Sequence, residues 1–291
     1  MSVTIITKNE AARLDAALAS VAWADEIVVV DAGSSDATAD IARRSGARVF
    51  IEGWPGFPQQ KNRAADLATH DWILSLDADE RVSPALAGEI RALLAAGPAA
   101  RGYRVPRVTR AFGRELRATD WYPDWQLRLY DRRAGRWDES RTVHESVRVE
   151  GDVTTLRGEL LHDGYRDLSE HLQKIDRYTT LAAEANAARG RDASLLQLAV
   201  HPPLAFLRNY VLRRGFTAGA AGLVVSAMNS WYVFLKLAKL WERIAADPEA
   251  KNYIDDALRP VSSDQGNDFV QVFADKIPQT YGAPSRHVNA A

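Results

Sequence analysis

The sequence predicts an α/β fold in which helices flank a mostly parallel sheet. Three short apolar runs, at 3–7, 26–31 and 47–51, alternate with stretches of helical composition, and this alternation is typical of βαβ units. A fourth apolar run, at 72–76, leads directly into the acidic segment 77–80. With 291 residues, of which 46% are hydrophobic, the chain can bury a core large enough for such a sheet.

The first two strands lead into polar loops. Residues 3–7 are rich in β-branched side chains, and Lys8-Asn9-Glu10 and a helical stretch through Ser20 follow them. The run 26–31 is too apolar for a half-exposed strand, and Ala32-Gly33-Ser34-Ser35-Asp36 leads from it into a helix that should end before Gly46. Because the carboxyl ends of parallel strands share one edge of a sheet, we expect both loops to lie beside the acids at 77–80.

A loop rich in Gly, Pro and aromatic residues, 53–63, opens a helix that runs to about Thr69. Lys61 and Arg63 stand near its start, where the helix macrodipole disfavours cations. Either a bound anion holds them there, or they are solvated side chains at an exposed helix start.

Asp77 and Asp79 end the fourth strand. Their spacing lets both carboxylates face one point, as a divalent cation bound to phosphate oxygens would require. An acidic turn before a helix would give the same pattern. The next helix should have Ser83 as its N-cap, should have Pro84 in its first position and should end near Gly97.

Two further strands, at 102–109 and 125–130, should extend the sheet. The loop between them gathers aromatic and acidic residues, among them Trp121 and Asp124. Such a loop is suited to stacking on sugar rings and accepting hydroxyl protons, and it could equally be a small aromatic core.

The carboxyl-terminal third is helical and then polar. A helix is predicted over about 169–189; the segment 201–215 combines apolar, aromatic and basic residues, and the run 216–235 is uncharged. We expect a pair of amphipathic helices at a membrane surface; a single membrane span and a soluble hairpin or dimer face are the alternatives. Residues from 248 onward are expected to be poorly ordered.

Composition excludes several classes of protein. There are 37 Lys and Arg against 38 Asp and Glu, so the chain lacks the basic character of a dedicated nucleic-acid binder. With no cysteine, it has no disulfide framework, thiolate metal site or cysteine nucleophile. The first ten residues do not read as a signal peptide, so we expect a cytoplasmic protein.

Four motifs in order resemble the family-2 glycosyltransferases of the GT-A type: 7–10 (TKNE), 28–36 (VVVDAGSSD), 61–62 (KN) and 76–80 (LDADE). The segments 23–26 (WADE) and 53–57 (GWPGF) further resemble the branch that contains lipopolysaccharide core glucosyltransferases. The resemblance implies a Rossmann-like GT-A domain over 1–166, a helical and membrane-associating region over 167–247, and a tail over 248–291.

The resemblance also implies roles for particular residues. Thr7, Asn9 and Glu10 would frame the uridine of a UDP-sugar donor, and Asp31 would contact its base or ribose. Lys61 would face the diphosphate. Mg²⁺ or Mn²⁺ would bind Asp79, with Asp77 nearby at the nucleotide and, as in some GT-A enzymes, a later histidine, here His162.

An inverting transfer needs a base for the acceptor hydroxyl. In the resembled branch a Val-His-Glu element stands where other family-2 enzymes carry an acidic base motif. Glu145 is therefore our candidate base, and Asp138 and Glu139 are its local competitors. His144 would orient the acceptor, or it is a structural histidine.

In that branch the acceptor is a lipid-linked glycan, which implies a protein peripheral at the inner face of the cytoplasmic membrane. Two other functions fit less well. A nucleotidyltransferase would need a glycine-rich phosphate loop after the first strand, and a non-catalytic membrane scaffold would not need the acids at 77, 79 and 145.

Overall fold

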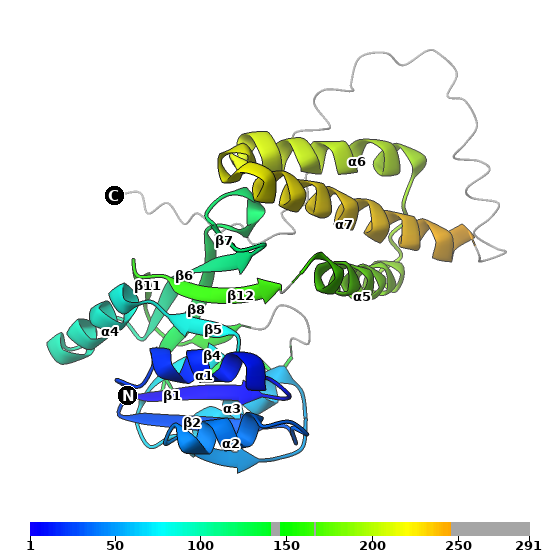
Figure 1. Ribbon diagram of the computed structural model, residues 1–291. Helices are drawn as coiled ribbons and strands as arrows, with labels where there is room; N and C mark the ends of the chain where they lie inside the picture. Colours follow the sequence, from blue (N-terminus) through cyan, green and yellow to red (C-terminus); the bar gives the residue numbers. More distant parts are fainter. Residues whose placement is uncertain (141–145, 166, 246–291) are drawn as a thin grey trace, which may run out of the picture. The chain divides into compact units, whose positions relative to one another are not determined.

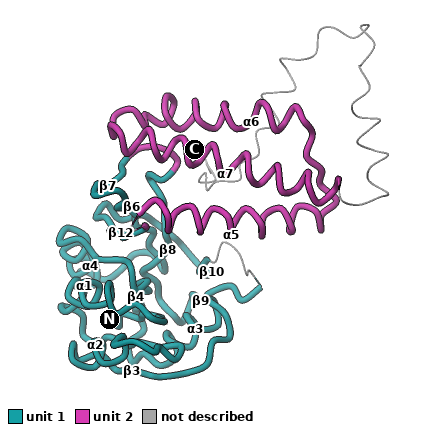
Figure 2. Tube along the Cα trace, turned by 45° about the vertical axis from the view of Figure 1, so that its right-hand side comes forward, with its two compact units in different colours: residues 1–117, 121–164 teal, residues 118–120, 165–291 magenta. Residues whose placement is uncertain are grey.

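The computed structural model describes residues 1–140, 146–165 and 167–245, which form two compact units (Figure 2). The first unit consists of residues 1–117 and 121–164, and the second contains 118–120 and the described residues from 165 onward. The expected tail at 248–291 lies outside the described residues, and the domain limits at 166 and 247 stay predictions.

The first unit begins with the alternation that the sequence predicts. Its elements are, in order, β1 (Ser2–Thr7), α1 (Ala11–Ser20), β2 (Glu26–Asp31), α2 (Thr38–Arg44), β3 (Arg48–Ile51), α3 (Phe57–Leu67), β4 (Trp72–Asp77), β5 (Glu80–Val82) and α4 (Pro84–Ala96). The strands that follow are β6 (Gly102–Ala111), β7 (Arg114–Leu116), β8 (Asp124–Asp131), β9 (Gly135–Trp137), β10 (Val147–Val149), β11 (Val153–Thr155) and β12 (Leu160–Tyr165).

The main sheet has the order β3-β2-β1-β4-β8-β6-β12-β5, with β7 and β11 paired to β6 (Figure 1). Strands β3, β2, β1 and β4 are parallel, whereas β8 is antiparallel to both β4 and β6. The strands β9 and β10 form a separate antiparallel ribbon. The expected α/β fold is confirmed, and the strands at 102–109 and 125–130 extend the sheet as predicted.

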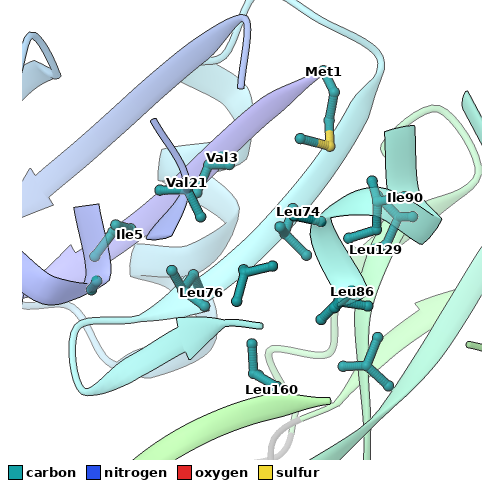
Figure 3. Close-up of a cluster of buried hydrophobic side chains, with 14 of the residues drawn as sticks. Met1, Val3, Ile5, Val21, Leu74, Leu76, Leu86, Ile90, Leu129 and Leu160 are labelled. Carbon is teal, nitrogen blue, oxygen red and sulfur yellow. The ribbon is translucent and has the colours of Figure 1, made fainter. Parts of the chain in front are cut away.

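Both faces of the parallel strands are buried, which explains their apolar sequences. Alternate residues of β1 and β4, such as Ile5 and Leu76, pack with α1 and α4 (Figure 3), while Ile6 and Ile73 pack on the opposite face with α3. Because side chains alternate across a strand, this division also fixes which way the residue at each strand end points.

The start of α4 follows the prediction. The Ser83 side chain accepts a hydrogen bond from Leu86 N at 3.2 Å, and Pro84 occupies the first turn. The helix ends at Gly97, whose φ of 85° suits glycine.

The second unit is helical. It contains part of a 3₁₀ turn, η1 (Thr119–Trp121), then α5 (Leu168–Ala187), α6 (Leu195–Leu207), the π-helical turn η2 (Arg208–Leu212), the 3₁₀ turn η3 (Gly215–Ala218) and α7 (Gly219–Ala245). Helix α7 packs against both α5 and α6, and Lys239 Nζ joins it to α5 through Asp176 Oδ1 at 2.7 Å.

The stretch Gly215–Ala245 is long and apolar enough to cross a membrane, by length and composition alone. Much of the apolar surface on α6 and α7 is exposed, including Leu204, Leu207, Leu223 and Trp231.

Candidate active site

Two loops at the carboxyl edge of the sheet are joined by hydrogen bonds. Asn9, which has a φ of 56°, accepts a bond from Ser35 N at 2.8 Å and donates its own N–H to Ser34 Oγ at 2.8 Å. The buried Asp31, which pairs in register with Thr7, accepts from Ser34 N at 2.8 Å. Three of the residues predicted to hold the nucleotide, Thr7, Asn9 and Asp31, are therefore brought together.

Two further groups lie at this edge, the backbone N–H of Glu10 and the hydroxyl of Thr7. Glu10 donates its backbone N–H to Thr38 Oγ1 at 2.9 Å, which fixes the start of α1 beside that of α2. Thr7 Oγ1 is buried and has no hydrogen-bond partner among the described residues. A buried hydroxyl without a partner is costly, so this atom is one that a bound ligand could satisfy.

Asp77 lies between two cations. Its position in β4 puts it on the same face as Ile73, toward α3, where Lys61 Nζ lies 2.9 Å from Asp77 Oδ1. On the same face, Arg128 Nη2 of β8 lies 2.5 Å from Asp77 Oδ2. Burial alone would raise the pKa of Asp77, but Arg128 and Lys61 outweigh it and hold that pKa far below its usual value.

Lys61 is held by an aromatic ring as well as by a carboxylate. Its ammonium lies 4.3 Å from the ring centre of Trp137, within the range of a cation–π contact. Asn62 holds the backbone that carries that ring, because its side chain accepts from Trp137 N at 2.9 Å and donates to Trp137 O at 3.0 Å. Arg63, by contrast, pairs with Glu52 at 2.8 Å.

Asp79 and His162 face each other at the end of this row. His162 Nε2 lies 3.5 Å from Asp79 Oδ2, and His162 Nδ1 lies 3.4 Å from Thr109 Oγ1. The pairing of β12 with β5 brings the histidine there, since His162 stands opposite Glu80 in the register. Burial raises the pKa of Asp79, and so does the negative charge of Asp77. His162 and the more distant Arg13 lower this pKa by a larger amount, so it lies below its usual value.

The metal ligands that the chain offers here suit a cation that is also bound by water and substrate. Within the described ranges, no three His, Cys, Asp or Glu side chains form a metal-binding group. Mg²⁺ typically takes one or two protein carboxylates and completes its shell with water and substrate phosphates. Asp79 and His162 can supply two ligands, whereas both oxygens of Asp77 pair with Lys61 and Arg128. These residues fit an ion bound together with a nucleoside diphosphate.

A partly buried chain of charges extends from Asp77 toward the loop before β8. Arg128 also donates to Glu80 Oε1 at 2.7 Å, and Arg107 bridges Glu80 at 3.0 Å and Asp124 at 2.6 Å. The chain contains three cations and three carboxylates, Lys61, Asp77, Arg128, Glu80, Arg107 and Asp124, so its formal charge balances. Sequence analysis missed Arg107 and Arg128; the available signal was that Arg128 shares the strand face of the apolar Tyr130.

The predicted acceptor residues are only partly described. Asp124 begins β8 and pairs with Arg107, and Trp121 is half-buried in the turn η1. Glu145 and His144 lie outside the described residues. Of the competing acids, Asp138 Oδ2 lies 2.8 Å from Arg148, and Glu139 Oε1 accepts from Asn62 at 2.7 Å.

Comparisons with known proteins show the family of the chain. The model of glycosyl transferase family 2 matches residues 2–146. The lipopolysaccharide core biosynthesis glycosyltransferase LpsC of Rhizobium meliloti is 34% identical over 264 residues, 89% of this chain and 97% of LpsC. The chain belongs to glycosyltransferase family 2.

A further relative and a solved structure are also similar to this chain. An uncharacterized glycosyltransferase of Rickettsia typhi is 32% identical, over 83% of this chain and 87% of the relative. Among solved structures, glucosyl-3-phosphoglycerate synthase from Mycobacterium tuberculosis, in complex with Mn²⁺ and UDP, superposes with a TM-score of 0.33 at 24% identity. That superposition covers 38% of this chain and 44% of the synthase.

Proposed function

We propose that this family-2 glycosyltransferase transfers a hexose from a UDP-sugar to a lipopolysaccharide core or other envelope glycan, with inversion at the anomeric carbon. One observation carries the proposal. The carboxyl edge of the sheet gathers the loop residues Asn9 and Asp31, the cation Lys61 and the Asp79–His162 pair. An open α/β sheet binds its ligands at this edge.

The donor would lie along the edge, with the nucleoside at one end and the diphosphate at the other. The Asp31 carboxylate can accept hydrogen bonds from a base or a ribose. The backbone around Asn9 can donate and accept hydrogen bonds with the same groups. Lys61 is close enough to Asp77 to exchange that partner for a phosphate oxygen without moving far. Charge-assisted bonds of this kind are the strong ones in recognising a diphosphate.

A divalent cation, Mg²⁺ or Mn²⁺, bound to Asp79 and His162 would neutralise the charge that develops on the departing UDP. The chain's own contribution is to hold these ligands rigidly. The backbone N–H of Asp163 donates to Asp79 O at 2.9 Å, and Thr109 contacts the second ring nitrogen of His162. Fixing the second nitrogen in this way orients a histidine ligand.

The transfer step needs a base on the acceptor side. The acceptor hydroxyl oxygen forms a bond to the anomeric carbon while the bond from that carbon to the UDP oxygen breaks, and UDP leaves with the electron pair. The proton of the hydroxyl passes to the base. We propose Glu145 for this role, with Asp138 and Glu139 as its competitors and His144 as an orienting group.

The acceptor is proposed from the relative and from the helical unit. LpsC is named for lipopolysaccharide core biosynthesis. The exposed apolar side chains of α6 and α7, with Arg213 and Arg214 at the turn between them, are suited to a lipid interface with anionic headgroups. We therefore infer a protein at the inner membrane face that acts on a lipid-linked glycan.

A screen of nucleotide sugars against purified deep-rough lipopolysaccharide tests the proposal. We expect one UDP-hexose to be transferred only when Mn²⁺ or Mg²⁺ is present, and NMR of the product should show the anomeric configuration opposite to that of the donor. Retention of configuration, or transfer that ignores the cation, would reject the mechanism.

A further inference from the structure

The start of α3 holds a buried polar side chain that the row of charged residues does not use. Gln60 is 1% exposed, and neither its side-chain nitrogen Nε2 nor its oxygen Oε1 has a hydrogen-bond partner among the described residues. An amide in this state has lost its bonds to water and gained none in return, which is costly for the folded chain. Because most buried polar atoms in proteins are bonded, two unbonded atoms on one amide point to a ligand that bonds it.

Gln60 belongs to the edge of the sheet that forms the candidate active site. Helix α3 follows β3 in the chain, so it starts at the carboxyl edge and runs back along the parallel strands. Gln60 is the fourth residue of this helix, and its neighbour Lys61 reaches Asp77 at the end of β4. The amide therefore starts from the same edge as the residues predicted to bind the nucleotide.

The helix directs Gln60 and Asn62 to opposite flanks. Side chains two positions apart on an α-helix are rotated by about 200° from each other. Asn62 bonds the backbone of Trp137 in β9. On the flank away from β9, α3 packs on β1 and β2, whose carboxyl ends lead into the loops that hold Asn9 and Asp31. Gln60 is thus turned toward the part of the edge where the nucleoside is proposed to lie.

We propose that the amide of Gln60 binds the base of the nucleotide donor. A carboxamide presents an acceptor oxygen beside donor N–H groups, and uracil presents its N3–H group beside a carbonyl oxygen. One base therefore satisfies both unbonded atoms of Gln60 with a pair of hydrogen bonds. Asp31, whose carboxylate only accepts, is then left to the ribose hydroxyls. The inference rests on the proposed function, because it takes the donor to be a UDP-sugar.

The amide reaches the base by turning about its own side-chain bonds. Its two polar atoms are buried in the free chain, and glutamine has rotatable bonds that carry its amide from one staggered position to another. Since neither atom is bonded to a described residue, this turn breaks no hydrogen bond within that part of the chain. The desolvation that burdens the free chain is relieved when the base binds.

Calorimetry on the full chain with Mn²⁺ tests the proposal with two probes, UDP and UDP methylated at N3 of uracil. Gln60→Met keeps the length of the side chain and removes both polar atoms. UDP should bind this variant about tenfold more weakly than the intact protein, as expected for the loss of one or two net hydrogen bonds. Methylation at N3 should weaken binding to the intact protein by a similar factor and have little effect on the variant. An equal effect of methylation on both proteins would overturn the proposal.

Stability separates a ligand-binding role of Gln60 from a structural one. Replacing an unbonded buried amide with an apolar side chain of similar volume should not cost stability. Without nucleotide, the urea midpoint of Gln60→Met should therefore equal or exceed that of the intact protein. A lower midpoint would mean that the amide is already bonded in the free chain, for example to a buried water, and the proposal would be wrong.

Gln59→Met is the matched control, because Gln59 is the preceding glutamine of the same helix and is half-buried. This variant should bind UDP as the intact protein does. If the intact protein binds no UDP in the presence of Mn²⁺, the proposed donor is wrong, and this inference falls with it. If it binds UDP and Gln60→Met binds UDP equally well, only the role of Gln60 is rejected.

Discussion

At the scale of single residues, Arg128 is the side chain on which most of the site's charge balance depends. Its side chain is 3% exposed, and it neutralises both Asp77 and the fully buried Glu80. Removing one partner from a buried ion pair leaves an uncompensated charge, which is far more costly than losing a surface pair.

Arg128→Met should therefore lower the free energy of unfolding by about 3–5 kcal/mol. Chemical denaturation measures it. The control is Arg136→Met, which breaks an exposed pair with Asp66 and should cost less than about 1 kcal/mol. Equal losses in the two variants would show that Arg128 is not the centre of the network.

His162 offers a second residue-scale prediction, because it contacts Asp79 while Thr109 holds its other nitrogen. His162→Ala should weaken Mn²⁺ activation of transfer by at least about tenfold, because even the loss of a residue that only supports a metal ligand costs about 10- to 100-fold. A titration of activity against Mn²⁺ measures this. An unchanged midpoint would remove His162 from the proposed metal shell.

How far the sequence predicted the site depends on the kind of contact. Asp77 and Asp79 were placed by local pattern, because an apolar run that ends in acids marks a strand end. The pairing of Asp77 with Arg128, 51 residues later, required knowing that β8 lies beside β4. Strand order is a long-range property, so local pattern could not predict this contact.

At the scale of elements, the ribbon β9–β10 depends on one side chain of α3. Asn62 makes two hydrogen bonds to the backbone of Trp137 and one to Glu139 at 2.7 Å. The indole in turn covers the ammonium of Lys61. A helix residue thus fixes a strand, and the strand fixes the predicted diphosphate ligand.

Asn62→Ala should cost about 1–3 kcal/mol of stability, because buried backbone groups lose their partners. It should also raise the KM for the UDP-sugar as Trp137 loses its place. Asn62→Asp keeps the acceptor for Trp137 N but loses the donor to Trp137 O, so this variant should also lose stability. Normal donor KM in Asn62→Ala would show that the clamp does not position Lys61.

Helices α6 and α7 are the elements predicted to contact a membrane surface. Leu212 and Phe216, at the turn between them, are 77% and 52% exposed. Leu212→Glu with Phe216→Glu should reduce sedimentation with phosphatidylglycerol vesicles by about tenfold or more, because apolar insertion is lost and negative charge is added. Leu181→Glu on α5, at a residue 46% exposed, is the matched control and should change little.

At the scale of the whole molecule, carboxylates with lowered pKa values set the response to acid. Burial would raise the pKa of Glu26, but bonds from Ser2, Thr69 and Arg48 lower it to about 2 from 4.5. The side chain of Arg133 is the main cause that lowers the pKa of Asp131 to about 2 from 3.8. A carboxylate whose pKa is lower in the folded state stabilises the fold above its unfolded pKa, and the contribution is lost as pH falls through the folded value.

The free energy of unfolding should therefore be flat down to about pH 5 and fall between about pH 5 and pH 2. Glu26→Gln should reduce stability at pH 6 and flatten this acid decline. Urea denaturation across that range measures both effects. A difference between the two proteins that stays constant from pH 6 to pH 2 would contradict the assignment to Glu26.

The parallel half of the sheet was easier to predict from the sequence than the short strand β5. Alternating strands and helices predicted the parallel half, since each βαβ unit is encoded within a short stretch of sequence. The short strand β5 was not predicted, because Glu80–Val82 pairs with β12, about 80 residues later. That pairing brings His162 to Asp79, so the candidate metal site itself depends on a long-range contact.

The proposed chemistry depends above all on Asp79 binding a divalent cation together with the UDP diphosphate. Calorimetric titration of UDP with and without Mn²⁺, into the intact protein and Asp79→Asn, tests it most directly. We expect Mn²⁺ to tighten UDP binding about tenfold or more in the intact protein and to have no such effect in Asp79→Asn. The same tightening in both proteins would contradict it.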